Sequence, residues 1–204
     1  MAFTFFFRDL HTLEHVVNQV VPLVAGRSNV RVWNAGCAMG METYTLAILF
    51  AEKMGYFAFK NLKIDATDID GSDLFAEIIN SGTYPNEDLQ RIPQGYFEKY
   101  FKPAEKPGHS RISELIRSRV TFRKHDLLTM TAVGDGYSLI VCKNVLLHFT
   151  PAERVQVMRV FYRSLAPQGL FAVEQTQVMP DEMAQFFERV VPDAQLFRKI
   201  EVAS

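Results

Sequence analysis

One stretch near the start of the chain limits its fold more than any other. The run Val30–Trp33 is β-branched and aromatic, which favours a strand, and Met41–Met54 carries apolar residues at helical spacing. Between them lies the loop Asn34–Gly40, which contains Gly36 and Gly40. This order predicts the first strand, loop and helix of a doubly wound α/β fold, in which a ligand lies beyond the carboxyl end of the strand.

Strand-like and helix-like segments alternate along the rest of the chain. An amphipathic helix over Leu10–Val24 precedes the first strand. Five strands alternating with helices predict a mainly parallel sheet with helices on both faces. The further predicted segments are strands at Leu62–Ile69, Val120–His125, Ser138–Lys143 and Leu170–Glu174, an edge strand at Gln195–Val202, and helices at Leu74–Ile79, from Pro151 onward and near Asp181–Val190.

The helix from Pro151 has the most clearly specified start. Thr150 is a good N-cap residue, Pro151 suits the first helical position, and Glu153 completes a capping box. Residues 166–169 read Ala-Pro-Gln-Gly, a sequence typical of a turn. We therefore predict that this turn ends the helix before the strand Leu170–Glu174.

The pattern loosens between Gly82 and Lys124, where prolines and glycines separate two short helical pieces at 97–101 and 112–117. We predict that 82–119 is a small insertion decorating a single domain that spans 1–204. Between Gly82 and Lys124, nine basic residues stand against five acidic ones. The stretch therefore predicts either a partner-facing surface or a solvated cover over one face of the sheet.

Composition excludes several classes of partner and site. The net charge of -1 argues against nucleic acid, and no run of 18 apolar residues is present to insert into a membrane. Arg8 and Asp9 interrupt the first apolar run, so we expect no signal peptide. Cys37 and Cys142 are the only cysteines and lack the clustered spacing of a zinc site, which favours a reducing cytoplasm and no metal. The sequence carries no signal for an oligomeric state.

The loop after the first strand and the acid after the second point to a nucleoside ligand. Gly36 and Gly40 let backbone approach a ligand, and Asp68 can accept hydrogen bonds from both hydroxyls of a ribose. The loop lacks the G-x-G-x-x-G pattern that packs a pyrophosphate, and Glu42 in the first helical turn repels phosphate. The predicted cofactor carries ribose and no phosphate, as S-adenosylmethionine (SAM) does.

Four short motifs follow one another along the chain. They are Phe3–Asp9 (FTFFFRD), Val32–Cys37 (VWNAGC) with Gly40, Glu42, Tyr44 and Leu46, Ala66–Asp70 (ATDID), and Cys142–Phe149 (CKNVLLHF). In order and spacing they are similar to motifs of the chemotaxis receptor methyltransferases, which are SAM-dependent protein-glutamate O-methyltransferases. The resemblance extends from Thr4 to the last strand, and it implies a Rossmann-like class I SAM methyltransferase fold.

The resemblance also implies roles for individual residues. Thr4 and Arg8 match residues that contact the cofactor, and the arginine also lies beside the transferred methyl group. The other implied cofactor-binding residues are Ala35, Gly36, Glu42, Asp68, Asp126, Leu127, Lys143 and Asn144. Among these, Glu42 and Asp68 have helix capping as the alternative role, and Arg8 has that of a surface cation.

The chain departs from the family pattern at three positions. Asp126 replaces an asparagine beside adenine and cannot offer its amide donors. Lys143 replaces an arginine, keeping the charge and losing the bidentate fork. His148 replaces a tyrosine that is a candidate for orienting the substrate. The histidine is either a catalytic residue, with Arg8, or a residue with no chemical role. Typical members of the family also carry an N-terminal helical domain that helps to engage receptors, and we expect only its last few residues, before the first motif, to be present here.

The family chemistry implies methyl transfer to a glutamate carboxylate of a protein substrate, such as a chemoreceptor, with S-adenosylhomocysteine (SAH) as the other product. That carboxylate is ionised at pH 7, so no general base is needed. Two alternatives stay open: a methyltransferase that acts on another acceptor, and a SAM-binding regulatory protein with impaired catalysis.

Overall fold

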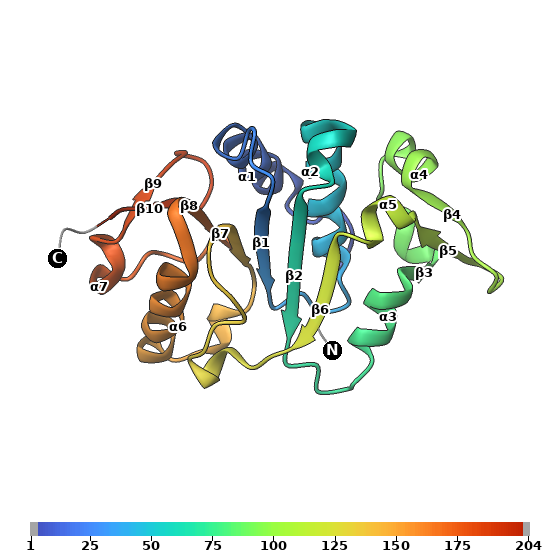
Figure 1. Ribbon diagram of the computed structural model, residues 1–204. Coiled ribbons are helices and arrows are strands. Elements are labelled where there is room, and N and C mark those ends of the chain that lie inside the picture. Colours follow the sequence, from blue (N-terminus) through green and yellow to red (C-terminus); the bar gives the residue numbers. More distant parts are fainter. Residues whose placement is uncertain (1–3, 202–204) are drawn as a thin grey trace.

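A seven-stranded sheet forms the centre of the computed structural model, which describes residues 4–201 (Figure 1). Phe3 of the first motif and Val202 of the last predicted strand lie outside these residues. The strands follow the order β6-β2-β1-β7-β8-β10-β9. Their bounds are β1 Val30–Ala35, β2 Leu62–Asp68, β6 Val120–Lys124, β7 Tyr137–Cys142, β8 Leu165–Val173, β9 Phe187–Arg189 and β10 Leu196–Lys199.

The strands from β6 to β8 run parallel, and β10 runs antiparallel to both β8 and β9. The chain builds outward from β1 through β2 to β6, and then continues on the other side of β1 with β7 and β8. The strand order therefore reverses between β1 and β7. In open parallel sheets this reversal is where a ligand lies, beyond the carboxyl ends of the strands.

Helices cover both faces of this sheet. Phe50 of α2 and Val17 of α1 join Val32 in one buried apolar cluster, whereas Phe161 of α6 joins Trp33 in a second. Because neighbouring residues of a strand face opposite sides, the two clusters lie on opposite faces. The predicted fold class, a Rossmann-like α/β sheet with helices on both faces, is thus confirmed. The bounds are α1 Leu10–Leu23, α2 Met41–Phe59, α3 Phe75–Ser81, α6 Pro151–Ser164 and α7 Asp181–Ala184.

The stretch 82–119 contains a second, three-stranded antiparallel sheet in the order β3-β5-β4. The sequence predicts its two helical pieces but not its strands. Tyr84, Phe101 and Ile112 from these strands are buried in the same apolar cluster as α2. The elements are β3 Thr83–Pro85, η1 Asn86–Leu89, α4 Gln94–Tyr100, β4 Phe101–Pro103, β5 His109–Ile112 and α5 Glu114–Arg117.

Three predicted boundaries are wrong. The expected turn at 166–169 belongs to β8, which begins at Leu165 because this residue pairs with Tyr137. The expected helix at Asp181–Val190 ends at Ala184, since 187–189 pair with β10. The last strand is not at the edge, because β10 lies between β8 and β9. In contrast, the helix start at Pro151 and its capping box are confirmed.

The turn formed by residues 4–9 is fixed by its aromatic side chains. Phe6 is fully buried, with its ring edge-on to Tyr84 at 5.0 Å and to Phe101 at 5.7 Å between centroids. Phe7 stacks on Tyr96 at 5.5 Å, and its backbone N–H donates to Thr45 Oγ1 at 3.0 Å. The turn is therefore held between α2 and the small sheet of the insertion.

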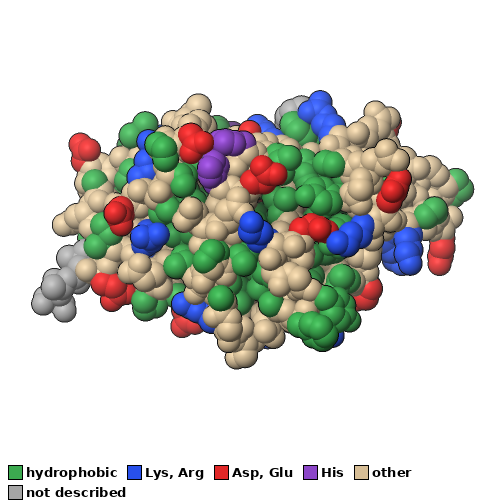
Figure 2. Space-filling view, turned by 90° about the horizontal axis from the view of Figure 1, so that it is seen from above, with side chains coloured by type: hydrophobic (Ala, Val, Ile, Leu, Met, Phe, Trp, Pro, Cys, Tyr) green, Lys and Arg blue, Asp and Glu red, His purple; other side chains and the backbone are tan. Residues whose placement is uncertain are grey.

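The surface carries mixed charges. Seen from above, basic and acidic side chains are interspersed across this face, with no region of a single sign (Figure 2). Within residues 4–201, none of the helices combines the length and the apolar character needed to cross a bilayer.

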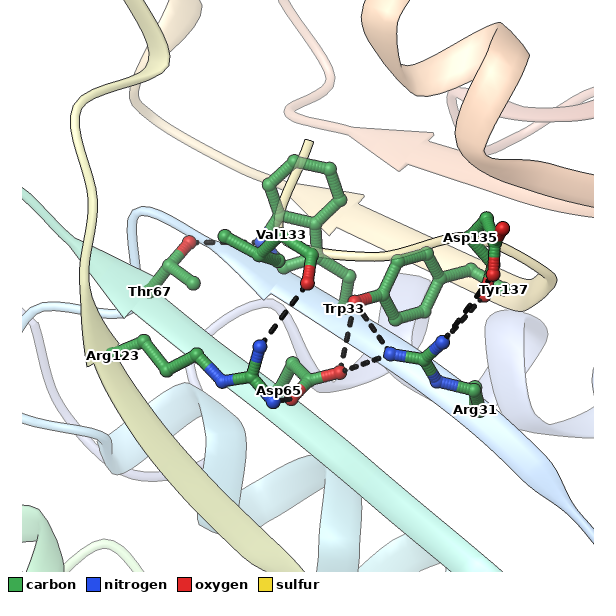
Figure 3. Close-up of polar contacts among 8 residues, drawn as sticks. All are labelled: Arg31, Trp33, Asp65, Thr67, Arg123, Val133, Asp135 and Tyr137. Carbon is green, nitrogen blue, oxygen red and sulfur yellow. Dashed lines mark hydrogen bonds and ion pairs between the residues drawn. The ribbon is translucent and has the colours of Figure 1, made fainter. Parts of the chain in front are cut away.

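A polar network joins four strands on the face that carries Trp33 (Figure 3). Asp65 of β2 accepts hydrogen bonds from Arg31 Nη2 at 3.0 Å and from Tyr137 Oη at 2.8 Å. Its other oxygen lies 3.2 Å from Arg123 Nη2. The network thus connects β1, β2, β6 and β7. It lies where the link from β6 to β7 contains only the short η2 helix, Leu127–Thr129.

Candidate functional site

The loop after β1 crosses to the end of β2 and is fixed there by backbone hydrogen bonds. The N–H groups of Gly36 and Cys37 donate to Thr67 O at 2.7 and 2.9 Å, and Ala38 N donates to Asp68 Oδ2 at 2.8 Å. Gly36 has φ +80°, and a Cβ there would lie 2.1 Å from Val145 Cγ2. Only glycine allows this turn to approach the loop after β7 so closely.

Asp68 holds this loop in place and is still partly exposed. Its Oδ1 accepts from Asp70 N at 3.2 Å, so each carboxylate oxygen is bound by a backbone N–H. Asp70 is buried and accepts from Leu74 N and Phe75 N, which caps the start of α3. Asp70 therefore caps α3, and Asp68 lies partly exposed at the rim of the sheet, which is the edge formed by the carboxyl ends of its parallel strands.

Glu42, in the first turn of α2, is oriented by a buried amide. Asn34 Nδ2 donates to Glu42 Oε1 at 2.9 Å, and Asn34 Oδ1 accepts from Thr43 Oγ1 at 2.5 Å. The sequence predicted Asn34 and Ala35 in the loop, but both residues lie within β1. The orienting role of Asn34 was not predicted, although a polar residue at the end of an apolar strand is a signal for it.

Lys143 brings a buried positive charge to the same place. Its side chain is 1% exposed, and its Nζ lies 3.0 Å from Asp9 Oδ2 and 3.5 Å from Glu42 Oε2. Neither contact has hydrogen-bond geometry, and Nζ has no aligned acceptor among residues 4–201. The ammonium group, at the carboxyl end of β7, can therefore still donate hydrogen bonds to a ligand.

A second chain of contacts connects Arg8 to the end of β8. Arg8 Nη2 donates to Asn144 Oδ1 at 3.4 Å, and Asn144 N donates to Glu174 Oε2 at 3.0 Å. Glu174 is 4% exposed, and its Oε1 has no hydrogen-bond partner in the described part of the chain. Glu174 was not predicted as a site residue; its signal is an acid directly after a buried parallel strand.

The remaining predicted residues lie outside these two groups of contacts. Asp126 Oδ1 accepts from Leu128 N at 2.8 Å and caps η2, and Leu127 is buried in the cluster that contains Trp33. His148 is exposed at the end of η3, Leu146–His148. None of the contacts above involves Thr4 or His148, and their roles stay predictions.

The rim carries more negative than positive charge. Four carboxylates, from Asp9, Glu42, Asp68 and Glu174, accompany two cations, from Arg8 and Lys143. Burial, and then the charge of Asp68, raises the pKa of the Cys37 thiol well above its ordinary value. Burial, and then the charge of Glu174, does the same to the pKa of Cys142. Both thiols are therefore neutral, and the rim suits a ligand with positive charge.

The buried polar atoms test whether SAM fits this rim. Lys143 Nζ and Glu174 Oε1 are buried without an aligned partner, which is costly unless a ligand completes their hydrogen bonds. A carboxylate can satisfy the first and an ammonium group the second, and an amino acid moiety carries both. Asp68 lies at the carboxyl end of β2, on the other side of β1 from Lys143, where a ribose can reach it. The residues present fit a cofactor that joins a nucleoside to an amino acid.

The chain is similar along almost its whole length to one family of known proteins. The family model described as CheR methyltransferase, SAM binding domain, matches residues 2–194. A chemotaxis protein methyltransferase of Listeria monocytogenes is 32% identical over 170 residues, which cover 82% of this chain and 62% of the relative.

Two further relatives come from pseudomonads. Chemotaxis protein methyltransferase Cher2 of Pseudomonas putida is 31% identical over 193 residues, covering 87% of this chain and 67% of its own. Chemotaxis protein methyltransferase 1 of Pseudomonas aeruginosa is 31% identical over 188 residues, covering 87% and 68%. The chain thus spans about two thirds of the length of these three relatives.

Proposed function

Because this chain belongs to the CheR methyltransferase family, with SAM as its cofactor, we propose that it transfers a methyl group to a glutamate carboxylate of a protein. The observation that carries the proposal is the rim described above. Two buried polar atoms without aligned partners, Lys143 Nζ and Glu174 Oε1, stand next to the loop held by Asp68. Such a rim binds a zwitterionic nucleoside more readily than a phosphate.

Most of the predicted cofactor residues have a task in this proposal. Asp68 accepts hydrogen bonds from the ribose, and Glu42 and Lys143 hold the charged amino acid end. Asp126 and Leu127 lie beside adenine, as the family resemblance implies. When bound, SAM supplies an electrophilic methyl group on a positively charged sulfur. The backbone of Ala35 and Gly36 lies against the cofactor, because glycine has no side chain to keep the two apart.

Arg8 is the proposed residue that positions the acceptor. Asn144 Oδ1, 3.4 Å from Arg8 Nη2, helps to direct the guanidinium group toward the rim. A glutamate acceptor is ionised at neutral pH, so the protein has to orient and desolvate it and not to remove a proton. We propose that Arg8 holds this carboxylate by charge-assisted hydrogen bonds and that His148 lies beside it as a further donor.

A groove lined by α6 and by residues that follow β8 offers space for a protein substrate. It has a volume of about 630 Å³ and runs between α6 and the segment that follows β8. Two basic residues, Arg154 and Arg159, and one acidic residue, Glu182, contribute to its lining. We propose that an acidic segment of the substrate, such as that of a chemoreceptor, lies along it. The two free, buried cysteines are consistent with activity in the cytoplasm.

Replacement of Arg8 tests the proposal directly. We expect Arg8→Ala to lower methyl transfer by about 100-fold or more, because the acceptor is no longer held, and to weaken SAH binding. Labelled methyl transfer to a candidate receptor, followed by alkaline release of volatile methanol, measures ester formation, and calorimetry with SAH measures binding. Arg27→Ala, at an exposed arginine after α1, is the matched control.

The outcomes separate the alternatives. Intact turnover in Arg8→Ala would remove Arg8 from the mechanism. SAH binding with labelled product that is stable to alkali would indicate a different acceptor. SAH binding without transfer to any acceptor would favour a regulatory protein, and absence of SAH binding would refute the cofactor site itself.

A further inference from the structure

Two histidines on one face of α1 point at a carboxylate that is distant in the sequence. His11 Nε2 lies 2.9 Å and His15 Nε2 lies 3.1 Å from the same oxygen, Asp193 Oδ2. The histidines are four residues apart, which places them one above the other on a helix. Their ring centroids are 4.5 Å apart. None of these three residues is among the rim residues described above.

We propose that His11, His15 and Asp193 form a binding site for a divalent transition-metal ion, with Zn²⁺ as the representative case. Their ligand atoms all lie within 4.8 Å of one another. In a tetrahedral site with bonds of about 2.0 to 2.2 Å, neighbouring ligand atoms are about 3.3 to 3.6 Å apart. The two observed N···O distances are close to this separation, so small side-chain rotations complete the site.

The chemistry of the three ligands selects the class of ion. Two imidazole nitrogens and one carboxylate suit zinc, nickel, copper or cobalt, whereas calcium and magnesium require oxygen ligands. Both Nε2 atoms face one anionic oxygen, so an ion that displaces their protons connects the three groups directly. The fourth position remains open to water, because the His11 and Asp193 side chains are 64% and 51% exposed.

The backbone around Asp193 already holds the carboxylate in place. Asp193 lies between β9 and β10, and the next residue, Ala194, is fully buried. Arg189 Nε donates to Ala194 O at 3.2 Å, and Gln175 Nε2 donates to Asp193 O at 3.4 Å. Little ordering of this turn is therefore needed for an ion to bind.

The sequence predicts no metal site because the third ligand is 178 residues away from His15. The two histidines alone are a common surface feature of helices. Only the fold, which packs α1 beside the end of the sheet that contains β10, brings Asp193 to them. Figure 2 shows histidine side chains beside acidic ones on the face that is seen from above. A bound ion would link the two ends of the described chain.

Zinc titration of tag-free, chelator-treated protein tests the site. We expect calorimetry to give one Zn²⁺ per chain near neutral pH, a higher Tm with zinc, and no response to Ca²⁺. His11→Ala, His15→Ala and Asp193→Asn should each weaken binding about tenfold or more.

His109→Ala, at a histidine of β5 in the insertion, is the matched control and should bind zinc like the parent protein. Circular dichroism shows whether each variant is folded. Absence of zinc binding by the parent protein overturns the proposal. Unchanged affinity in any of the three ligand variants removes that residue and overturns the three-ligand site.

Discussion

At the scale of single residues, the candidate site depends on groups that fix one another's orientation. Asn34 holds Glu42, and Glu42 lies beside the buried ammonium of Lys143. Gly36 has the most restrictive position of this set, because its backbone is left-handed and Val145 packs directly on its Cα. A side chain at Gly36 would push the loop away from the strand ends where a ligand would lie.

Replacing Gly36 should therefore affect both stability and binding. For Gly36→Ala we expect a loss of about 3 kcal/mol in the free energy of unfolding, since strain in φ adds to overlap with Val145. SAH affinity should fall as well. Gly26→Ala is the matched control, because Gly26 has φ +78° with nothing within 4 Å of the added Cβ.

Urea unfolding and SAH titration measure these effects. For Gly26→Ala we expect only the cost of the left-handed backbone, about 1 kcal/mol, and unchanged SAH affinity. Equal losses in the two variants would show that the contact with Val145 is unimportant.

At the scale of elements, strong local signals predict the structure and weak ones do not. The capping box at Thr150 fixes the start of α6, as expected. The strands of the insertion escape prediction because β3 and β4 have three residues each, and both end in proline. Residues 181–190 fit a helix by their apolar spacing, but pairing with β10 makes part of them a strand. Tertiary pairing thus overrides local preference.

Some residues of the candidate site were predicted from the sequence, and others were not. Asp68, at the end of β2, was predicted from its place at a strand end, and Asn144 was predicted from the family resemblance. The orienting partners Asn34 and Glu174 were missed because their role depends on which strands are neighbours. That order is a property of the whole sheet.

The network around Asp65 should stabilise four strands at once. We expect Asp65→Ala to lower the free energy of unfolding by about 2 to 3 kcal/mol, because Arg31 and Tyr137 lose a buried hydrogen-bond partner. The partly exposed Arg31 can replace that hydrogen bond with one to water, whereas the buried Tyr137 cannot. Asp135→Ala is the control: this acid is 95% exposed and 3.7 Å from Arg31 Nη1, so its loss should change stability by less than about 0.5 kcal/mol. Urea denaturation that gives the same midpoint for both variants would contradict a structural role for the network.

At the scale of the whole molecule, buried phenol and thiol groups must all remain neutral in the folded state. Burial, followed by a hydrogen bond to Glu52, raises the pKa of Tyr100 to about 12. Burial is also the first cause of the raised pKa values of other residues in the core. These are Tyr44, Tyr84, Tyr137, Cys37 and Cys142. Their ordinary values are 10.0 for tyrosine and 9.0 for cysteine.

This shared shift predicts instability at alkaline pH. A group whose folded pKa is raised contributes its full stability below its unfolded pKa and loses it as pH rises toward the folded value. The urea midpoint should therefore be constant up to about pH 8 and fall steeply between about pH 9 and pH 11. Tyrosine absorbance and circular dichroism should change together. Ionisation of these tyrosines near pH 10 in a chain that stays folded would be incompatible with the raised pKa values.

The anchoring of Phe6 has a consequence for evolution and for engineering. Its ring packs against Tyr84 and Phe101, which both belong to the insertion. Arg8, two residues later, is the residue proposed to position the acceptor. Trimming or swapping the small sheet would dislodge the turn that carries Arg8. We therefore expect the two parts to be inherited together, and we expect a partner that displaces the small sheet to displace Arg8, the proposed acceptor-binding residue, as well.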